Sequence, residues 1–342
     1  MAILKCKMCG GTMNYDRAKN LAVCPYCGTT STIYEQDRKL FEQFQTMFSA
    51  LLEKGENGRR PEEGFWVEAE RKELTREDGE IIVIHCLWQM RSDCAVVYVA
   101  KNHVIYTFAE EYEAYADHYI KMVSEVEYPN REMEKELKNY IPTVAAHCRL
   151  ADGGVLIAIE KPAGVYPIRL LGILLDRHAA WVVSRLENLC CLLSYNGIVL
   201  NGLTVDNLFV SPADHQIYLY GGWWFAGFEN DRMNGISGDA RKCIYRKYLE
   251  KKRCHFSTDL ESLRFAVIRL LGCETREELA GLLALPEPFR SFLLDTAKES
   301  AAKDFACWDR VLEQSYGERK FIPLPVTEEE LYSRTGVRDD EK

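Results

Sequence analysis

The chain has 342 residues, of which 47% are hydrophobic and 28% charged, and it carries a formal net charge of −9. This length can bury a large core, and the composition is that of an ordinary globular protein, which excludes disordered and low-complexity classes. No apolar run approaches the length of a bilayer-spanning helix, and the acidic balance provides little attraction for phosphate groups.

Two C-x2-C pairs stand in the first thirty residues. Cys6 and Cys9 form the first pair, Cys24 and Cys27 the second, and a glycine follows each. Each pair can turn two thiolates toward one ion, so together they supply the four sulfurs of a closed tetrahedral zinc site. Disulfide or redox use is the weaker alternative, because the other nine cysteines are scattered and no secretory signal is present. Residues 1–34 resemble a zinc ribbon with one structural Zn²⁺.

Residues 35–64 are expected to connect this module to the rest of the chain. Apolar residues recur at helical spacing over 34–54, which predicts an amphipathic helix. Its apolar stripe is expected to pack on a neighbouring module, with a partner-binding surface as the alternative. Residues 55–64 have the glycine-rich, charged composition of a flexible linker.

Residues 65–162 predict a small β-rich lobe. Runs of β-branched and aromatic residues predict strands at 80–88, 94–100 and 103–108. Helical patterns follow at about 110–126 and 130–140, and a further strand is expected at 155–162. The turn between the first two strands, from Gln89 to Cys94, contains no glycine.

Residues 163–326 predict a larger helical lobe. A helix from His178 ends at Asn196-Gly197, a C-cap and turn signal, and a loop and two strand-like runs lead to Gly221-Gly222-Trp223-Trp224. A buried helix opening near Asp259 is predicted at 257–272. Three shorter helices are expected at 276–285, 288–302 and 304–315, and the charged residues 327–342 are expected to fray.

The order of these elements resembles a protein kinase over about residues 65–325. Kinases carry a catalytic loop H-R-D-L-x-x-x-N, and counting back from Asn207 places Leu200, Asn201 and Gly202 at its His, Arg and Asp positions. The resemblance implies an α+β fold, in which a zinc ribbon precedes a bilobal kinase-like domain. The combination is similar to bacterial zinc-ribbon proteins with a kinase-like domain, some carried by mobile elements.

The resemblance also implies that both catalytic acids are missing. The loop Asp that accepts the substrate proton is replaced by Gly202, and the magnesium-binding Asp of the D-F-G triplet is replaced by Gly221, although Asn207 remains. Asp259 matches an acid that in kinases has a structural role, tying its helix to the backbone of the catalytic loop. A fold-supporting acid without catalytic acids is typical of a pseudokinase.

The nucleotide site offers few candidates for binding. The phosphate-contacting Lys of kinases falls near Tyr106 or Thr107, and its partner could be one of three residues: Glu113, Glu134 and Glu136. Lys101 and Asp206, with Asn207, are the residues that could preserve a nucleotide or metal site. Trp223 and Trp224 are expected to fill the cleft or core, and a ligand-stacking platform is the alternative.

The segment 225–256 stands where kinases place the activation loop. It lacks the A-P-E motif and carries a basic cluster between Arg241 and Arg253. The simpler interpretation is a solvated loop. The alternative is a docking patch for an acidic or phosphorylated partner.

Three functions of different class follow from these patterns. We favour a catalytically inactive scaffold or regulator that binds an unidentified protein partner, with the ribbon as an accessory docking module. One alternative is an atypical ATP-binding protein or kinase that uses Lys101 and the displaced acid Asp206. The other is a nucleic-acid-associated regulator, which the net charge disfavours. Nucleotide binding and membrane association are not expected, and thirteen cysteines without a secretory signal predict a cytoplasmic location.

The zinc site can be tested directly by metal analysis of the purified chain. We expect one bound zinc ion per molecule and a several-fold loss of zinc in Cys6→Ser, because the closed site needs all four thiolates. Cys307→Ser, outside the two pairs, serves as the control and should retain the metal. Full zinc occupancy in Cys6→Ser would exclude the proposed ligand set.

Overall fold

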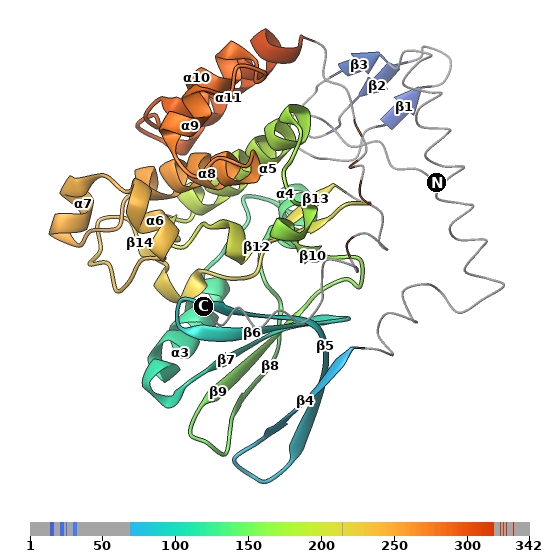
Figure 1. The fold of residues 1–342 in the computed structure, drawn as a ribbon, viewed down its shortest axis with the longest axis vertical. Helices are drawn as coiled ribbons and strands as arrows, with labels where there is room; N and C mark the ends of the chain where they lie inside the picture. The colour runs from blue at the N-terminus through green and yellow to red at the C-terminus, as the bar shows by residue number, and fades with distance from the viewer. Residues whose placement is uncertain are drawn as a thin grey trace.

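The structure is a computed structural model that describes residues 14–16, 21–23, 25, 30–32, 69–213 and 215–317, together with residues 322, 324, 326 and 331. The four predicted zinc ligands, the helix expected at 34–54 and the linker at 55–64 lie outside the described residues. Figure 1 shows a β-sheet lobe and a helical lobe in residues 69–317, as the sequence predicts.

The small lobe is built on one antiparallel sheet of six strands in the order β4-β5-β6-β7-β9-β8. Its strands are β4 Glu70–Thr75, β5 Ile81–Ser92, β6 Ala95–Ala100, β7 His103–Phe108, β8 Val144–Arg149 and β9 Val155–Glu160. The four predicted strands are confirmed as β5, β6, β7 and β9. The edge strands β4 and β8 were not predicted, because edge strands bury few residues and so carry a weak apolar pattern.

Side chains of β7 alternate between two hydrophobic clusters. Val104, Tyr106 and Phe108 belong to the main core of the molecule, whereas Ile105 belongs to a smaller cluster. This is the period of two expected for a strand that is covered on both faces. Because successive side chains point to opposite faces of the sheet, Val104, Tyr106 and Phe108 lie on the face that packs in the main core.

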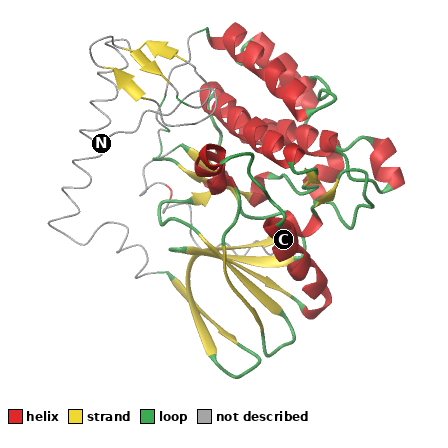
Figure 2. Ribbon diagram, turned by 180° about the vertical axis from the view of Figure 1, so that it is seen from behind, coloured by secondary structure: helices red, strands yellow, loops and turns green. Residues whose placement is uncertain are grey.

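The two small-lobe helices each begin or end with a 3-10 turn. The elements are η1 Glu110–Tyr112, α3 Glu113–Ser124, α4 Arg131–Leu137 and η2 Lys138–Tyr140. Asn130 caps α4 by accepting a hydrogen bond from the Met133 backbone N–H at 2.8 Å. Ala116, Tyr119 and Met122 recur every three residues and form the buried stripe of α3. Figure 2 shows α3 beside the sheet, and the helix also packs against the large-lobe segment Trp223–Phe225.

The large lobe consists of helices with two small antiparallel sheets between them, β10-β12-β13 and β11-β14. Its helices are α5 Asp176–Tyr195, α6 Gly238–Cys243, α7 Arg246–Lys251, α8 Phe256–Leu270, α9 Arg276–Ala280, α10 Glu287–Leu294 and α11 Ala301–Tyr316, with 3-10 turns η3 Ile168–Leu171, η4 Val205–Asn207 and η5 Trp223–Phe225. Its strands are β10 Tyr166–Pro167, β11 Ile198–Val199, β12 Leu208–Ser211, β13 Gln216–Leu219 and β14 Gly227–Phe228.

Two predictions for this lobe need correction. The helix expected at 288–302 ends at Leu294, and a separate helix begins at Ala301, where the Ser300 hydroxyl accepts from the Lys303 N–H. The segment 225–256, predicted as a solvated loop, contains α6 and α7. Ala240 of α6 is buried with Ile236 and Ile244 in a separate hydrophobic cluster, against which Tyr248 and Leu249 of α7 pack.

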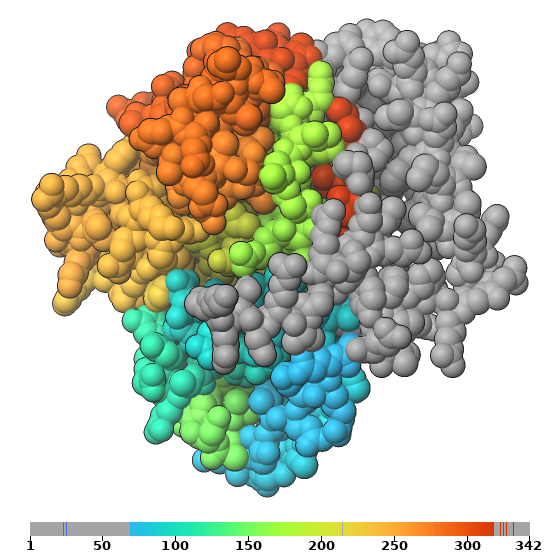
Figure 3. Space-filling model, in the orientation of Figure 1, coloured from blue at the N-terminus to red at the C-terminus, as the bar shows by residue number. Residues whose placement is uncertain are grey.

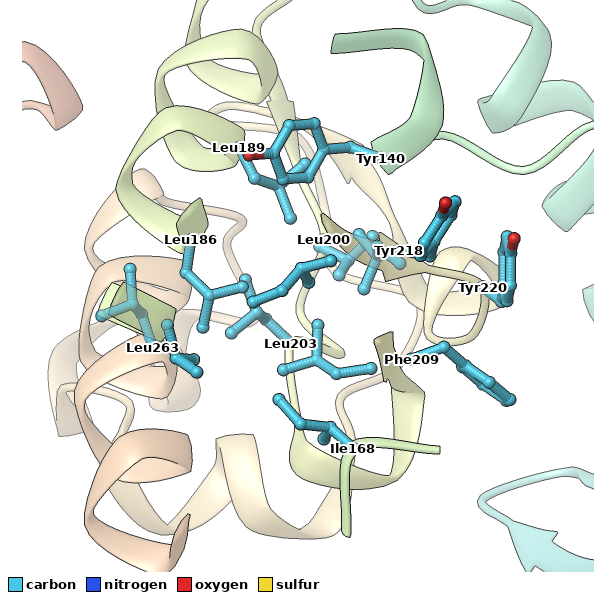
Figure 4. Packing of buried hydrophobic residues seen from close by; sticks show 14 of the residues in the cluster. Tyr140, Ile168, Leu186, Leu189, Leu200, Leu203, Phe209, Tyr218, Tyr220 and Leu263 are labelled. Carbon is cyan, nitrogen blue, oxygen red and sulfur yellow. The ribbon is translucent and has the colours of Figure 1, made fainter. Parts of the chain in front are cut away.

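The core of the large lobe lies between α5, α8 and the loops that follow α5. Figure 4 shows how these elements meet, with Leu186 and Leu189 from α5, Leu263 from α8, and Leu200 and Leu203 from the loop. Leu331 is fully buried in the same cluster, although it lies in the tail that was expected to fray. This residue at least is anchored by apolar packing.

An ion pair inside the large lobe joins α8 to α11. Arg264 Nη2 donates to Asp304 Oδ1 at 2.9 Å, and Nη1 lies 2.7 Å from Oδ2, with both side chains almost fully buried. Burial raises the pKa of the nearby Glu187 carboxyl well above its usual range, and the negative charge of Asp304 adds to this rise. Within the described residues, Arg264 is the cation that lies close to both of these buried acids, Asp304 and Glu187.

We expect Arg264→Met to lower the free energy of unfolding at neutral pH by about 3–5 kcal/mol, because it leaves the buried Asp304 without a counter-charge. Denaturant unfolding measures the change. Lys303→Met is the control, because it removes an exposed ion pair between Lys303 of α11 and Glu299 just before that helix, with an expected effect below about 1 kcal/mol. Equal effects in the two variants would contradict the role given to the buried pair.

Candidate functional site

Asp259 fixes the position of the loop that follows β11. Its Oδ2 accepts from the Leu200 backbone N–H at 2.7 Å and its Oδ1 from the Asn201 N–H at 3.0 Å. Burial raises the pKa of this carboxyl to about 7, while the two N–H groups lower it. The predicted contact between Asp259 and the catalytic-loop backbone is confirmed, and it supports the alignment that places Gly202 next in the loop.

Asn207 is a buried link between the two lobes. Its Nδ2 donates to the Gly202 carbonyl at 2.7 Å, and its Oδ1 accepts from the Ser92 hydroxyl of β5 at 3.2 Å. Its side chain and backbone are only 1% exposed. Both ends of the amide are therefore engaged by protein groups, in the residue that the sequence alignment matches to the magnesium-holding Asn of kinases.

Three glycines allow the backbone to approach Asn207 closely. A Cβ atom on Gly221 would lie 2.1 Å from Asn207 Oδ1, and one on Gly202 would lie 2.8 Å from the Gly222 Cα. Gly222 has a φ of +86°, which disfavours any side chain. The packing at these positions leaves no space for a carboxylate without rearrangement.

The tip of the β5–β6 hairpin reaches the large lobe directly. Two residues, Asp93 and Cys94, separate the strands, and Asp93 has a φ of +38°. Asp93 Oδ2 accepts from the Ser237 hydroxyl at 2.5 Å and lies 3.4 Å from the donor Nε1 of Trp224. In kinases, the loop at this position covers the nucleotide phosphates. Here the hairpin tip and the large lobe are joined by hydrogen bonds instead.

A group of aromatic rings fills the space beneath the hairpin. The ring centroid of Trp224 lies 5.5 Å from that of Tyr106, 6.0 Å from that of Phe108 and 6.0 Å from that of Tyr119. Tyr119 of α3 also donates its hydroxyl to the Tyr220 carbonyl at 2.6 Å. Trp223 and Trp224 are both fully buried, which confirms that they fill the interior.

Tyr106 and Thr107 of β7, the two residues that the sequence alignment assigns to the phosphate-contacting Lys, face opposite sides of the strand. Tyr106 points into the main core, whereas the Thr107 hydroxyl lies 3.5 Å from the Val96 carbonyl on the neighbouring strand. Lys101 precedes β7 by two residues, and its carbonyl accepts from Lys161 Nζ at 2.7 Å. Lys101 lies in the turn between β6 and β7, whereas Tyr106 is the fourth residue of β7. Lys101 is thus not brought to the aromatic group.

None of the three candidate acids reaches Tyr106. Glu113 opens α3 but pairs with Arg149 of β8, and Glu134 and Glu136 lie on α4. The residue of α3 that faces Tyr106 is Tyr119, with ring centroids 6.0 Å apart. The side chain that Tyr106 meets on α3 is therefore a second phenol ring and not a carboxylate.

Asp206, the candidate displaced acid, is engaged by a cation. Arg169 Nη1 lies 2.9 Å from Asp206 Oδ1, and both side chains are partly exposed. Burial raises the pKa of this carboxyl, and Arg169 opposes the rise. The structure brings Asp206 to η3 and does not bring it to Lys101 or to the amide of Asn207.

Sequence reasoning missed the residues that join the lobes. The bonds from Ser92 to Asn207 and from Ser237 to Asp93 connect residues 115 and 144 positions apart. The absence of glycine between Gln89 and Cys94 indicated an altered loop, but nothing local indicated its partners.

In the part of the chain that is described, no cluster of His, Cys, Asp and Glu could hold a metal ion, and no helix is long and apolar enough to cross a membrane.

The glycine packing makes a prediction that compares two sites in the same chain. Gly221→Ala should lower the free energy of unfolding by at least about 2 kcal/mol, because its Cβ would displace the Asn207 amide. Gly238→Ala is the control, because no heavy atom lies within 4 Å of its Cβ position. Its expected effect is below about 1 kcal/mol. Thermal and denaturant unfolding measure both, and a neutral Gly221→Ala would refute the close packing.

Comparison with known proteins identifies the fold of this chain but no family. No family model matches the chain, and no curated protein matches it. A solved structure of vaccinia related kinase 3 superimposes with a TM-score of 0.51 at 16% sequence identity, covering 78% of this chain and 99% of that one. At this identity the likeness concerns the fold alone. The chain therefore has a protein-kinase-like fold, with a β-sheet lobe and a helical lobe.

Proposed function

We propose that this protein is a catalytically inactive kinase-like scaffold or regulator that binds a protein partner. The observation that carries the proposal is the hydrogen-bonded contact between the hairpin tip and the large lobe, made by Ser92 with Asn207 and by Asp93 with Ser237. These bonds lie where nucleotide phosphates and magnesium would need space. Side-chain bonds across the lobes support a role that does not use a nucleotide.

The chemistry of phosphoryl transfer supports the same proposal. A kinase needs a base for the substrate hydroxyl and an acid that holds magnesium against the phosphates. Gly202 and Gly221 supply neither group, and the surrounding packing excludes a side chain at Gly221. Tyr106 cannot replace the positive charge of a Lys. Each loss removes orders of magnitude in rate, and their combination argues for a non-enzymatic role.

The alternatives receive less support from the geometry. ATP binding through Lys101 and Asp206 would require both residues in the cleft, but Asp206 pairs with Arg169 and Lys101 lies at the turn before β7. A nucleic-acid-associated role remains disfavoured by a net charge of −9. We therefore retain the scaffold as the single proposed function, with a cytoplasmic location as a prediction.

The zinc ribbon is proposed as an accessory module of this scaffold. The described residues near the cysteines form three short antiparallel strands, β1 Asn14–Asp16, β2 Leu21–Val23 and β3 Thr30–Thr32. β2 ends one residue before Cys24, so a strand leads directly into the second C-x2-C pair. This arrangement supports a structural zinc module, for which a closed four-thiolate site is suited.

Thermal unfolding with magnesium and ATP tests the proposed function. We expect no saturable rise in the unfolding temperature at millimolar MgATP, because a ligand that binds only the folded state would stabilise it by mass action. An active kinase unfolded under the same conditions is the positive control. A saturable rise that disappears in Lys101→Ala or Asp206→Ala would replace the scaffold by the ATP-binding alternative.

A further inference from the structure

Helices α6 and α7 form a compact element on the outside of the large lobe. Their inner side contributes Ala240 and Ile244 to a hydrophobic cluster that also contains Met233 and Cys254. Backbone bonds fasten the ends of the element, from Met233 N–H to the Lys252 carbonyl at 2.8 Å and from Cys254 N–H to the Asp231 carbonyl at 3.0 Å. The element therefore presents a fixed outer surface.

That outer surface is strongly basic. Residues 238–253 contain seven basic and two acidic residues, a net charge of +5, so the rest of the chain carries −14. All seven basic side chains are exposed; they are Arg241, Lys242, Arg246, Lys247, Lys251, Lys252 and Arg253. We call this set the α6–α7 basic surface. It concentrates positive charge on one element of an otherwise acidic molecule.

Intramolecular pairing neutralises only part of this charge. Lys242 pairs with Asp239 at 2.6 Å, and Arg246 pairs with Glu250 at 2.6 Å. Within the described part of the chain, no carboxylate pairs with Arg241, Lys251 or Lys252. These three side chains are available to an external anionic group.

The position of the surface is suited to docking. Figure 1 places α7 at the outer edge of the large lobe, away from the small-lobe sheet, and Figure 3 shows the corresponding yellow-orange atoms projecting at that edge. The hairpin contact between the lobes is made by Ser237, the residue just before α6, whose hydroxyl donates to Asp93. A partner could therefore bind here without opening the cleft.

We infer that the α6–α7 basic surface docks an acidic polypeptide segment of a partner protein. This inference rests on the proposed scaffold function and gives the chemistry of its partner. Lysine and arginine attract carboxylate or phosphoserine side chains at an exposed surface. The prefolded element would lose little conformational freedom on binding, which reduces the entropic cost of association.

The charge distribution favours a short acidic peptide over a longer polyanion. At physiological salt, electrostatic attraction extends only about 8 Å, so the surface acts locally. Nucleic acid or an anionic membrane would extend past the surface and meet the remaining charge of −14, which repels it. A peptide with a few clustered acids contacts the basic side chains alone.

Fluorescence anisotropy of a labelled glutamate-rich peptide tests the inference on the full chain. We expect the peptide to bind, its glutamine counterpart to show no binding, and affinity to fall as salt is raised. The triple variant Arg241→Glu, Lys251→Glu and Lys252→Glu should lower affinity at least about tenfold. The triple variant Arg131→Glu, Lys135→Glu and Lys138→Glu makes the same change in net charge on exposed residues of α4 and η2, and should change affinity less than about twofold.

Several outcomes would overturn this inference. Absence of peptide binding at low salt, or equal losses in the two triple variants with intact thermal unfolding, would refute a local docking surface. Tighter binding of duplex DNA, RNA or anionic vesicles than of the peptide would show that the ligand class is wrong. Failure of the proposed scaffold function is a separate result, because MgATP stabilisation would then appear whether or not the peptide binds.

Discussion

The amide of Asn207 is the contact on which the centre of this molecule depends. It donates to the Gly202 carbonyl and accepts from Ser92 of the small lobe, and it is almost completely buried. A buried amide must keep its partners, because an unpaired donor or acceptor costs about 1–3 kcal/mol. Glycine at 221 follows from this requirement, because any Cβ there would displace the amide oxygen. The side chain that the sequence alignment matches to the metal-binding Asn of kinases is thus engaged in bonds within the protein.

The bonds that join the lobes and the contacts that maintain the kinase-like fold involve different residues. Asp259 holds the loop backbone through two N–H groups, and apolar side chains of the loop pack in the core between α5 and α8. Neither element requires a nucleotide. The similarity in fold to a solved kinase structure at 16% identity follows from packing and backbone bonds that do not depend on the chemistry of the cleft.

Joining the lobes also affects how the surface can be used. In a kinase the lobes move about a cleft that binds and releases nucleotide. Here Asp93, Ser237 and the rings around Trp224 connect the lobes through bonds and apolar contacts, which favours one fixed arrangement. A rigid body with a basic element on an acidic background is suited to recognition, because its charges are already positioned before a partner arrives.

The sequence by itself determined the frame of the fold. Asn207 and Asp259 gave the loop alignment, and the runs of β-branched residues at 81–108 gave three central strands, because these signals are local or fixed by spacing. The spacing of Cys6, Cys9, Cys24 and Cys27 likewise predicts zinc, on residues outside the described ranges. Only the tertiary structure decided that Tyr119 faces Tyr106, that Arg169 engages Asp206, and that Ser92 and Asp93 close the cleft. Those contacts join residues far apart in the chain, and the side that each residue faces depends on how the two lobes pack, which no local pattern records.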